Sequence, residues 1–122
     1  MNINLFDDSS KVPRSRDSIR IEHLDAQVQP DRYRVRAELS VTPFQERPNL
    51  ILALINHTTG TVVHEMNVIG MMQPQMEFTF HIRGQNDPAG EYTLEVELFY
   101  ETRNPPQDRR TLTVTIPAEA DA

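Results

Sequence analysis

Apolar and polar residues alternate along much of this chain, and the alternation is clearest between residues 92 and 100. Apolar side chains stand at every second position there, in the order Tyr92, Leu94, Val96, Leu98 and Tyr100. Successive residues of a β-strand point to opposite faces of a sheet, so this pattern predicts a strand with one buried face. No long stretch shows the period of about 3.6 residues that marks an amphipathic helix, which indicates an all-β fold.

Six further segments have the composition and spacing of strands. They cover residues 19–28, 33–41, 50–55, 61–66, 76–82 and 112–116. In the first segment the apolar positions change parity after Ile21, which predicts a β-bulge near His23. The segment from Leu50 to Ile55 is apolar on both faces, which is typical of a central strand. Turn residues separate the seven segments, and this favours an antiparallel sandwich or barrel.

The stretch that leads into the sixth predicted strand, DPAGEY at residues 87–92, resembles the tyrosine corner of immunoglobulin-like and fibronectin type III-like sandwiches. The resemblance implies a seven-stranded antiparallel immunoglobulin-like β-sandwich, in which the Tyr92 hydroxyl bonds the backbone of the preceding loop. The alternative is a core tyrosine whose hydroxyl reaches water. Leu94 stands where immunoglobulin domains carry a cysteine, and the chain has no tryptophan. The resemblance therefore concerns architecture and is silent about function.

The length of 122 residues suits a single domain with one core. Residues 1–18 offer few apolar side chains to offset the entropy of ordering them, so we expect a polar, flexible N-terminal tail. Residues 118–122 are expected to fray for the same reason. The sandwich itself is expected to span residues 19–117.

Residues that carry catalysis or bind metals are scarce. The chain has no cysteine, which excludes thiol nucleophiles, disulfides and thiolate metal sites. Four histidines fall on different predicted strands or strand ends and do not converge as metal ligands do: His23, His57, His64 and His81. No nucleophile elbow or phosphate loop occurs, and Glu95 and Glu97 are expected on an open, solvated face. We therefore expect no catalytic residue, no cofactor and no metal.

Charge argues against nucleic acid as a partner. Twelve basic residues oppose 18 acidic ones, for a net charge of −6, and phosphate backbones repel such a chain. Arg32, Arg34 and Arg36 share one face of the second predicted strand, where contacts with Glu77 of the fifth are a simpler explanation than a polyanion site. No apolar run is long enough to span a membrane and the N-terminus lacks a secretory signal, so we expect a cytoplasmic protein with no membrane partner.

The outward face of the third, sixth and seventh predicted strands is the first candidate interaction surface. Ile51 and Ile55 are expected there beside Phe99. An exposed apolar strip of this kind favours binding to another protein or to a second copy of the chain. The alternative is that the N-terminal tail covers the strip through Leu5 and Phe6.

The loops at one end of the sandwich form the second candidate surface. The topology brings together residues 43–48, 67–75 and 102–108. Phe44, Met71 and Met72 lie in these loops, with Arg47 and Arg103 beside them. Methionine suits adaptable binding surfaces and also fills gaps at the ends of cores, so the Met-rich loop is either a binding tip or a core plug.

These observations favour a non-catalytic protein-interaction or accessory module. The alternative is a module that binds carbohydrate or another ligand at the loop end, through Phe44, Met71, Met72 and Arg103. Many carbohydrate modules hold their ligands on aromatic platforms. Here tryptophan is absent, and all three tyrosines fall on positions predicted to face inward.

Overall fold

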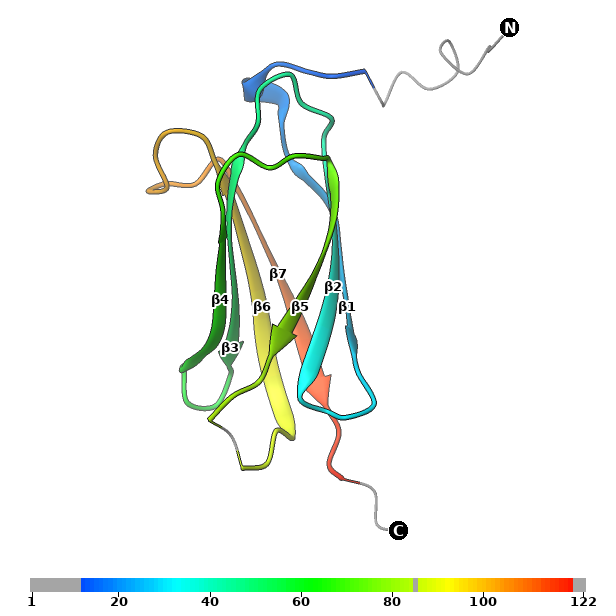
Figure 1. Ribbon diagram of the computed structural model, residues 1–122. Coiled ribbons are helices and arrows are strands. Elements are labelled where there is room, and N and C mark those ends of the chain that lie inside the picture. The colour runs from blue at the N-terminus through cyan, green and yellow to red at the C-terminus, as the bar shows by residue number, and fades with distance from the viewer. Residues whose placement is uncertain (1–11, 85, 120–122) are drawn as a thin grey trace, which may run out of the picture.

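Seven β-strands in two antiparallel sheets build the molecule, and the sheets pack face to face (Figure 1). The computed structural model describes residues 12–84 and 86–119. The predicted all-β, seven-stranded antiparallel sandwich is confirmed. The strands are β1 (Ile21–Val28), β2 (Arg34–Val41), β3 (Asn49–Asn56), β4 (Val62–Val68), β5 (Gln75–His81), β6 (Gly90–Phe99) and β7 (Asp108–Ile116).

The two sheets differ in size. One holds three strands in the order β1-β2-β5, and the other holds four in the order β4-β3-β6-β7. The chain therefore changes sheet between β2 and β3, between β4 and β5, and again between β5 and β6. Within the described residues the helical content is a single 3₁₀ turn at Arg16–Ser18.

The core lies between the sheets, and its centre is the pairing of β3 with β6. Three fully buried leucines of β3 stand in register with three buried residues of β6: Leu50 with Leu98, Leu52 with Val96, and Leu54 with Leu94. Strand β3 lies inside its sheet, between β4 and β6, as its apolar sequence predicted. Apolar packing therefore holds the two halves of the chain together without a disulfide.

A β-bulge in β1 explains the change of parity in the sequence. The register between β1 and β2 shifts between Ile21 and His23, as predicted. Ile19, Ile21 and Leu24 are all buried, because the extra residue turns the stretches on both sides of it toward the core.

The tyrosine corner is present at the start of β6. Tyr92 is 1% exposed, and its hydroxyl donates a hydrogen bond of 2.8 Å to the Pro88 carbonyl. This confirms the predicted bond to the preceding loop and excludes a hydroxyl that merely reaches water. Burial raises the pKa of Tyr92, and Asp87 adds to the shift. The hydroxyl therefore stays a donor and fixes the turn that enters β6.

Residues 12–18 lie against the loop end of the sandwich, which differs from the flexible tail expected for residues 1–18. The Arg14 N–H donates to the Pro43 carbonyl at 2.9 Å, and the Gln45 N–H donates to the Arg14 carbonyl at 2.9 Å. This short parallel bridge to the β2–β3 loop gives the backbone of the segment hydrogen-bond partners.

Arg16 holds the same segment in place through charge. Its guanidinium pairs with Glu46 and, at 3.1 Å, with Glu101, and it lies 4.7 Å from the centre of the Tyr100 ring. The hydrogen bond to Glu46 is the main cause of the raised pKa of Arg16, and it also lowers the pKa of Glu46. Charge pairing thus orders a segment that has few apolar contacts. Residues 1–11, with Leu5 and Phe6, and residues 120–122 lie outside the described residues.

The arginines of β2 do not meet Glu77, so the expected cross-strand contacts are wrong. The register of β2 with β5 makes other pairs: Arg34 with His81, Arg36 with Thr79, and Glu38 with Glu77. Arg34 instead pairs with Asp31 of the preceding turn at 2.8 Å. The alternation placed these side chains on the correct face, but the register between the strands decided their neighbours.

Arg32 precedes β2 and holds the β1–β2 turn in place through hydrogen bonds. Its φ of 69° lies in the left-handed region that glycine favours. Its side chain donates to the Pro117 carbonyl at 2.9 Å and to Asp87 at 3.1 Å. These contacts tie the turn to the end of β7 and to the β5–β6 loop, and they offset the backbone strain.

Replacing Tyr92 with phenylalanine removes the hydroxyl that donates to the Pro88 carbonyl in the buried corner. We expect the free energy of unfolding to fall by about 1–3 kcal/mol, measured by urea denaturation followed by circular dichroism. Tyr33→Phe is the matched control, because the Tyr33 hydroxyl also donates to a loop carbonyl but the side chain is 38% exposed. The control should lose no more than about 0.5 kcal/mol. Equal losses in the two variants would contradict the importance of the corner.

Candidate functional site

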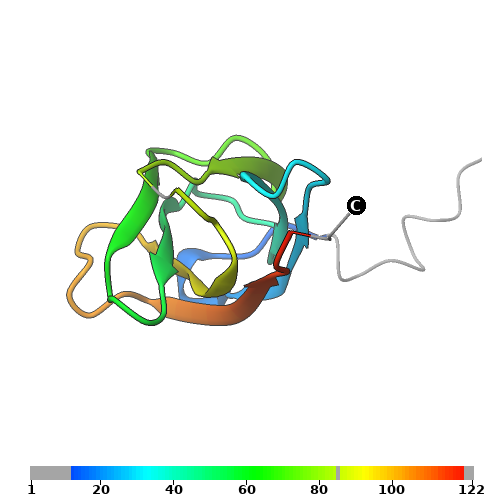
Figure 2. The same ribbon diagram turned by 90° about the horizontal axis from the view of Figure 1, so that it is seen from below.

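The two sheets meet along two margins, and these margins are closed to different degrees. At the first, side chains of β7 bind the backbone of β1. The Ile21 N–H donates to Asp108 Oδ2 at 2.8 Å, and Arg110 Nη2 donates to the Ile21 carbonyl at 2.7 Å. At the second margin, β4 and β5 are the outer strands of their sheets and do not pair with each other. Figure 2 shows this second margin on the side of the sandwich opposite to β1 and β7.

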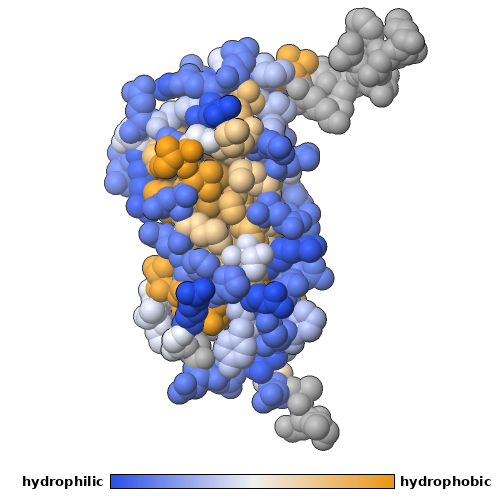
Figure 3. All heavy atoms as spheres, in the orientation of Figure 1, coloured by the Kyte–Doolittle hydropathy of each residue, from blue (hydrophilic) through white to orange (hydrophobic). Residues whose placement is uncertain are grey.

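Apolar side chains gather along the β4–β5 margin. Ile69 and Met72 of the connecting loop are 79% and 65% exposed. Half-buried side chains continue the patch along the strands, with Met66 and Val68 on β4 and Met76 on β5. Figure 3 shows this surface, which begins over the loop and runs down between the two strands. We call these five residues the apolar margin.

The loop that carries Met72 is anchored from within by Met71. Met71 is fully buried, and its N–H donates to a carbonyl of the β2–β3 loop at 2.8 Å. The Gly70 N–H donates to Asn49 Oδ1 at 2.8 Å, and a φ of 68° at Gly70 lets the chain turn there. Met71 therefore fills the core, which is one of the two roles expected for the Met-rich loop. Because it is buried, it is no longer a candidate for surface contacts. Met72 lies on the surface beside it.

The outward face of β3, β6 and β7 is more closed than the sequence suggested. Ile51, Ile55 and Phe99 are half-buried there. Two ion pairs cross the face: Arg103 with Glu97 at 2.8 Å, and Arg109 with Glu95. The expectation that these glutamates are solvated is wrong, because the β6–β7 loop and β7 supply an arginine to each.

The loops of residues 43–48 and 102–107 lie at the same end of the sandwich as the β4–β5 loop, as predicted (Figure 1). The Tyr100 hydroxyl donates to the Glu46 carbonyl at 2.9 Å and ties the base of one loop to the other. Phe44 is half-buried and packs against the core. This end therefore presents Met72 as an exposed apolar tip, while Phe44 is largely structural.

His64 joins β4 to β5 at the end of the apolar margin far from the loop. Its Nδ1 accepts a hydrogen bond of 2.7 Å from the His81 N–H, and its ring packs edge-on against Phe80 with 5.6 Å between ring centres. Burial lowers the pKa of His64, and the nearby His81 and Arg83 lower it further. The acceptor nitrogen therefore carries no proton at neutral pH. The sequence suggested a solvated histidine, because alternation does not reveal which strand of the other sheet lies opposite.

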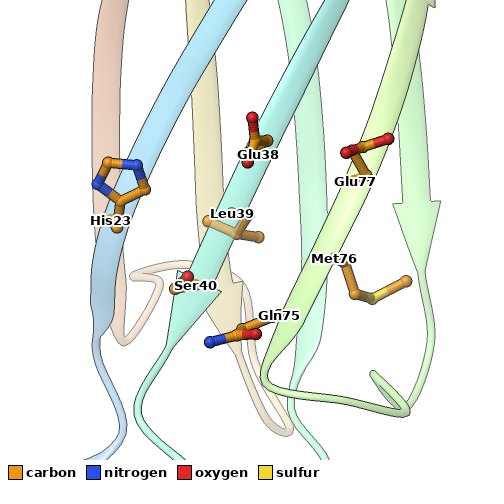
Figure 4. A pocket seen from close by; sticks show the side chains of 7 residues that line it. All are labelled: His23, Glu38, Leu39, Ser40, Gln75, Met76 and Glu77. Atoms are coloured by element: carbon orange, nitrogen blue, oxygen red, sulfur yellow. The ribbon is translucent and has the colours of Figure 1, made fainter.

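Three carboxylates form a row across the outer face of the three-stranded sheet. The registers place Asp25 opposite Glu38, and Glu38 opposite Glu77. None of the three has an ion-pair partner among the described residues. Figure 4 shows Glu38 and Glu77 with His23 at an open cavity of about 400 Å³. We call Asp25, Glu38 and Glu77 the acidic row; the sequence did not reveal it, because each member comes from a different strand.

A cavity of about 620 Å³ lies at the other end of the sandwich, around Tyr33, Arg32 and Asp87. Tyr33 is 38% exposed, which corrects the expectation that all three tyrosines face inward. Arg32 pairs with Asp87 at 3.1 Å, and the lining of the cavity also includes Asp31 and Glu119.

Residues 12–84 and 86–119 contain no cluster of three histidine, aspartate or glutamate side chains arranged to hold a metal ion. The same residues include no helix with the length and apolar character needed to cross a membrane.

No protein-family model matches the sequence, and no curated protein matches it. Solved structures share its fold, among them two β-glucuronidases. The β-glucuronidase of Bifidobacterium dentium, complexed with coumarin-3-O-glucuronide, has a TM-score of 0.52 and 14% sequence identity, and the match covers 80% of this chain. The β-glucuronidase of Lactobacillus rhamnosus has a TM-score of 0.50 and 19% identity, and that match covers 81% of this chain.

This chain corresponds to a small part of those enzymes, namely 18% of the first and 16% of the second. At such low identity the likeness shows the fold alone.

The His64 bond should make the stability of the protein depend on pH. Protonation of Nδ1 removes the acceptor for the His81 N–H, so the folded protein takes up this proton less readily than the unfolded chain does. In the unfolded chain the histidine titrates at about pH 6.5. The stabilisation is complete above that pH and is lost as the pH falls through the lowered pKa of folded His64. Urea denaturation between about pH 7 and about pH 5 should show this loss.

His64→Asn should reduce this loss on acidification, because the asparagine amide oxygen can accept the bond and does not titrate in this range. His57→Asn, at an exposed turn, is the control and should follow the wild-type profile. A His64→Asn profile that parallels the wild type would show that the bond does not respond to pH.

Proposed function

We propose that this chain is a non-catalytic β-sandwich module that binds another protein, or a second copy of itself, through the apolar margin. The observation that carries the proposal is the exposure of Ile69 and Met72 next to a half-buried apolar strip. A contiguous apolar surface bordered by polar residues is typical of a protein-binding site.

The side chains of the apolar margin suit this role energetically. Covering a large apolar side chain completely is favourable by about 1.5–3 kcal/mol, and Ile69 and Met72 are largely uncovered. Four of the five methionines of the chain lie at this margin or directly beneath it, at positions 66, 71, 72 and 76. Methionine adapts its shape to a partner more readily than branched side chains do.

We also propose that the sandwich is of the immunoglobulin-like type. The Tyr92 corner and the division into three- and four-stranded sheets support it. The likeness to parts of two β-glucuronidases supports an accessory role within a larger protein or assembly. The activity of those enzymes is not carried over, because the match covers so little of their length.

The alternative site for carbohydrate or another ligand at the loop end has weaker support. Met71 is buried, Phe44 is half-buried, and Arg103 is paired with Glu97. Arg16 lies over the Tyr100 ring. The described part of this end therefore offers no open aromatic platform for a sugar ring.

The double variant Ile69→Ser, Met72→Ser should lose association without losing stability, because both side chains are exposed. Sedimentation velocity measures self-association. To capture a partner, a photo-reactive residue is introduced at the exposed position 73 in the cells that make the chain. We expect a dimer or one defined adduct for the wild type and neither for the double variant.

Val12→Ser is the matched control, since Val12 is 54% exposed but lies outside the apolar margin. Alanine at Ile51, Ile55 and Phe99 tests the sheet face by the same measurements. A strictly monomeric wild type that forms no defined adduct would contradict the proposal, as would an association lost only in the sheet-face variant.

A further inference from the structure

On the basis of the proposed function, we propose that β5 receives an extended peptide as a fourth strand of its sheet. The peptide alternates apolar side chains, which face into the sandwich, with outward side chains, of which the one opposite Glu77 is basic. Three observations on the described residues support these features in turn: backbone groups of β5 without hydrogen bonds, an exposed apolar surface, and a row of carboxylates without ion pairs.

The free edge of β5 presents backbone groups in the arrangement that a new strand requires. Two bonds of 2.8 Å fix the phase of the β2–β5 ladder: Ile82 N–H to the Tyr33 carbonyl, and Val41 N–H to the Pro74 carbonyl. Even-numbered residues of β5 therefore direct their N–H and C=O groups toward β2, and odd-numbered residues direct theirs away. Within the described residues, three odd-numbered residues have no backbone hydrogen bond on this side: Gln75, Glu77 and Thr79.

The next odd-numbered residue, His81, shows that a backbone N–H on this edge can find a hydrogen-bond acceptor outside its own sheet. The His81 N–H donates to His64 Nδ1 of β4 at 2.7 Å. The free stretch therefore runs over residues 75–79 and ends where His64 closes the margin. Strands of about five residues are the common length in globular proteins, so the stretch is long enough to hold one.

The apolar margin explains why the inward side chains of the peptide are apolar. The four-stranded sheet has one more strand than its partner, and β4 is the outer strand on the side of β5. Met66 and Val68 stand opposite the buried Leu52 and Leu50, so they face the inside of the sandwich, yet they remain half-buried. A strand added to β5 lies across from them and covers them together with Met76.

The acidic row explains why the outward side chain opposite Glu77 is basic. Like charges directly opposite each other destabilise a sheet, whereas opposite charges stabilise it. Glu38 and Glu77 form a pair that is not bonded through the backbone, and in such pairs the side chains approach most closely. A lysine or arginine on the added strand extends the row Asp25, Glu38 and Glu77 with a charge of opposite sign.

The probe for this proposal is a capped heptapeptide in which valine and lysine alternate. A valine–glutamate heptapeptide and a block permutation of the valine–lysine composition are the controls. Isothermal titration calorimetry with the full chain should detect binding of the alternating valine–lysine peptide alone. Hydrogen exchange followed by NMR should slow at least about tenfold at the amides of Gln75, Glu77 and Thr79 in the complex.

Thr79→Pro removes one of the free N–H groups and should still fold, because that N–H takes no part in the ladder with β2. Thr79→Val keeps the N–H and is the matched control. We expect the proline variant to lose the peptide and the valine variant to keep it. If Thr79→Pro does not fold, Glu77→Lys decides instead: it should weaken the valine–lysine peptide at least about fivefold and favour the valine–glutamate peptide.

Protection at other amides, or equal binding of all three peptides, would overturn strand addition. If no peptide binds but the adduct at position 73 still depends on Ile69 and Met72, strand addition fails and the proposed function stands. A monomeric wild type that forms no adduct and binds no peptide overturns both. If self-association protects the amides of Gln75, Glu77 and Thr79, the strand added to β5 comes from a second copy of the chain. That result overturns the proposal of a basic peptide.

Discussion

Strand β3 lies between β4 and β6, and its three leucines meet three apolar residues of β6 in register. This pairing forms the centre of the four-stranded sheet. It sets β4 at one side of the four-stranded sheet and β7 at the other, and it provides the surface on which β2 and β5 pack from the opposite sheet. The Tyr92 corner then fixes how the chain returns from β5 into β6.

The contrast between the two margins follows from the number of strands. Three strands facing four leave one outer strand without a counterpart. On the β1–β7 side, Asp108 and Arg110 close the margin by bonding the backbone of Ile21. On the β4–β5 side, the His64 ring supplies a bond at one end, and apolar side chains fill the rest. The candidate surface is therefore the place where the sandwich is structurally incomplete.

Electrostatics in this protein is decided by register more than by composition. Glu95 and Glu97 were expected on a solvated acidic face, and arginines that follow in the chain neutralise both. Conversely, the arginines of β2 were expected beside Glu77, and the register puts Glu38 there. The two carboxylates of that pair stand side by side although 39 positions separate them in the sequence.

The sequence by itself determined the strands, the bulge near His23, the central place of β3 and the tyrosine corner, because each depends on a local period or a short motif. Only the tertiary structure decided which residues meet across strands and sheets, as with the acidic row and the contact between His64 and His81. It also separated Met71, which is buried, from Met72, which is exposed. Loop residues have no period, and register depends on pairing between segments far apart in the chain, so neither could be obtained from alternation alone.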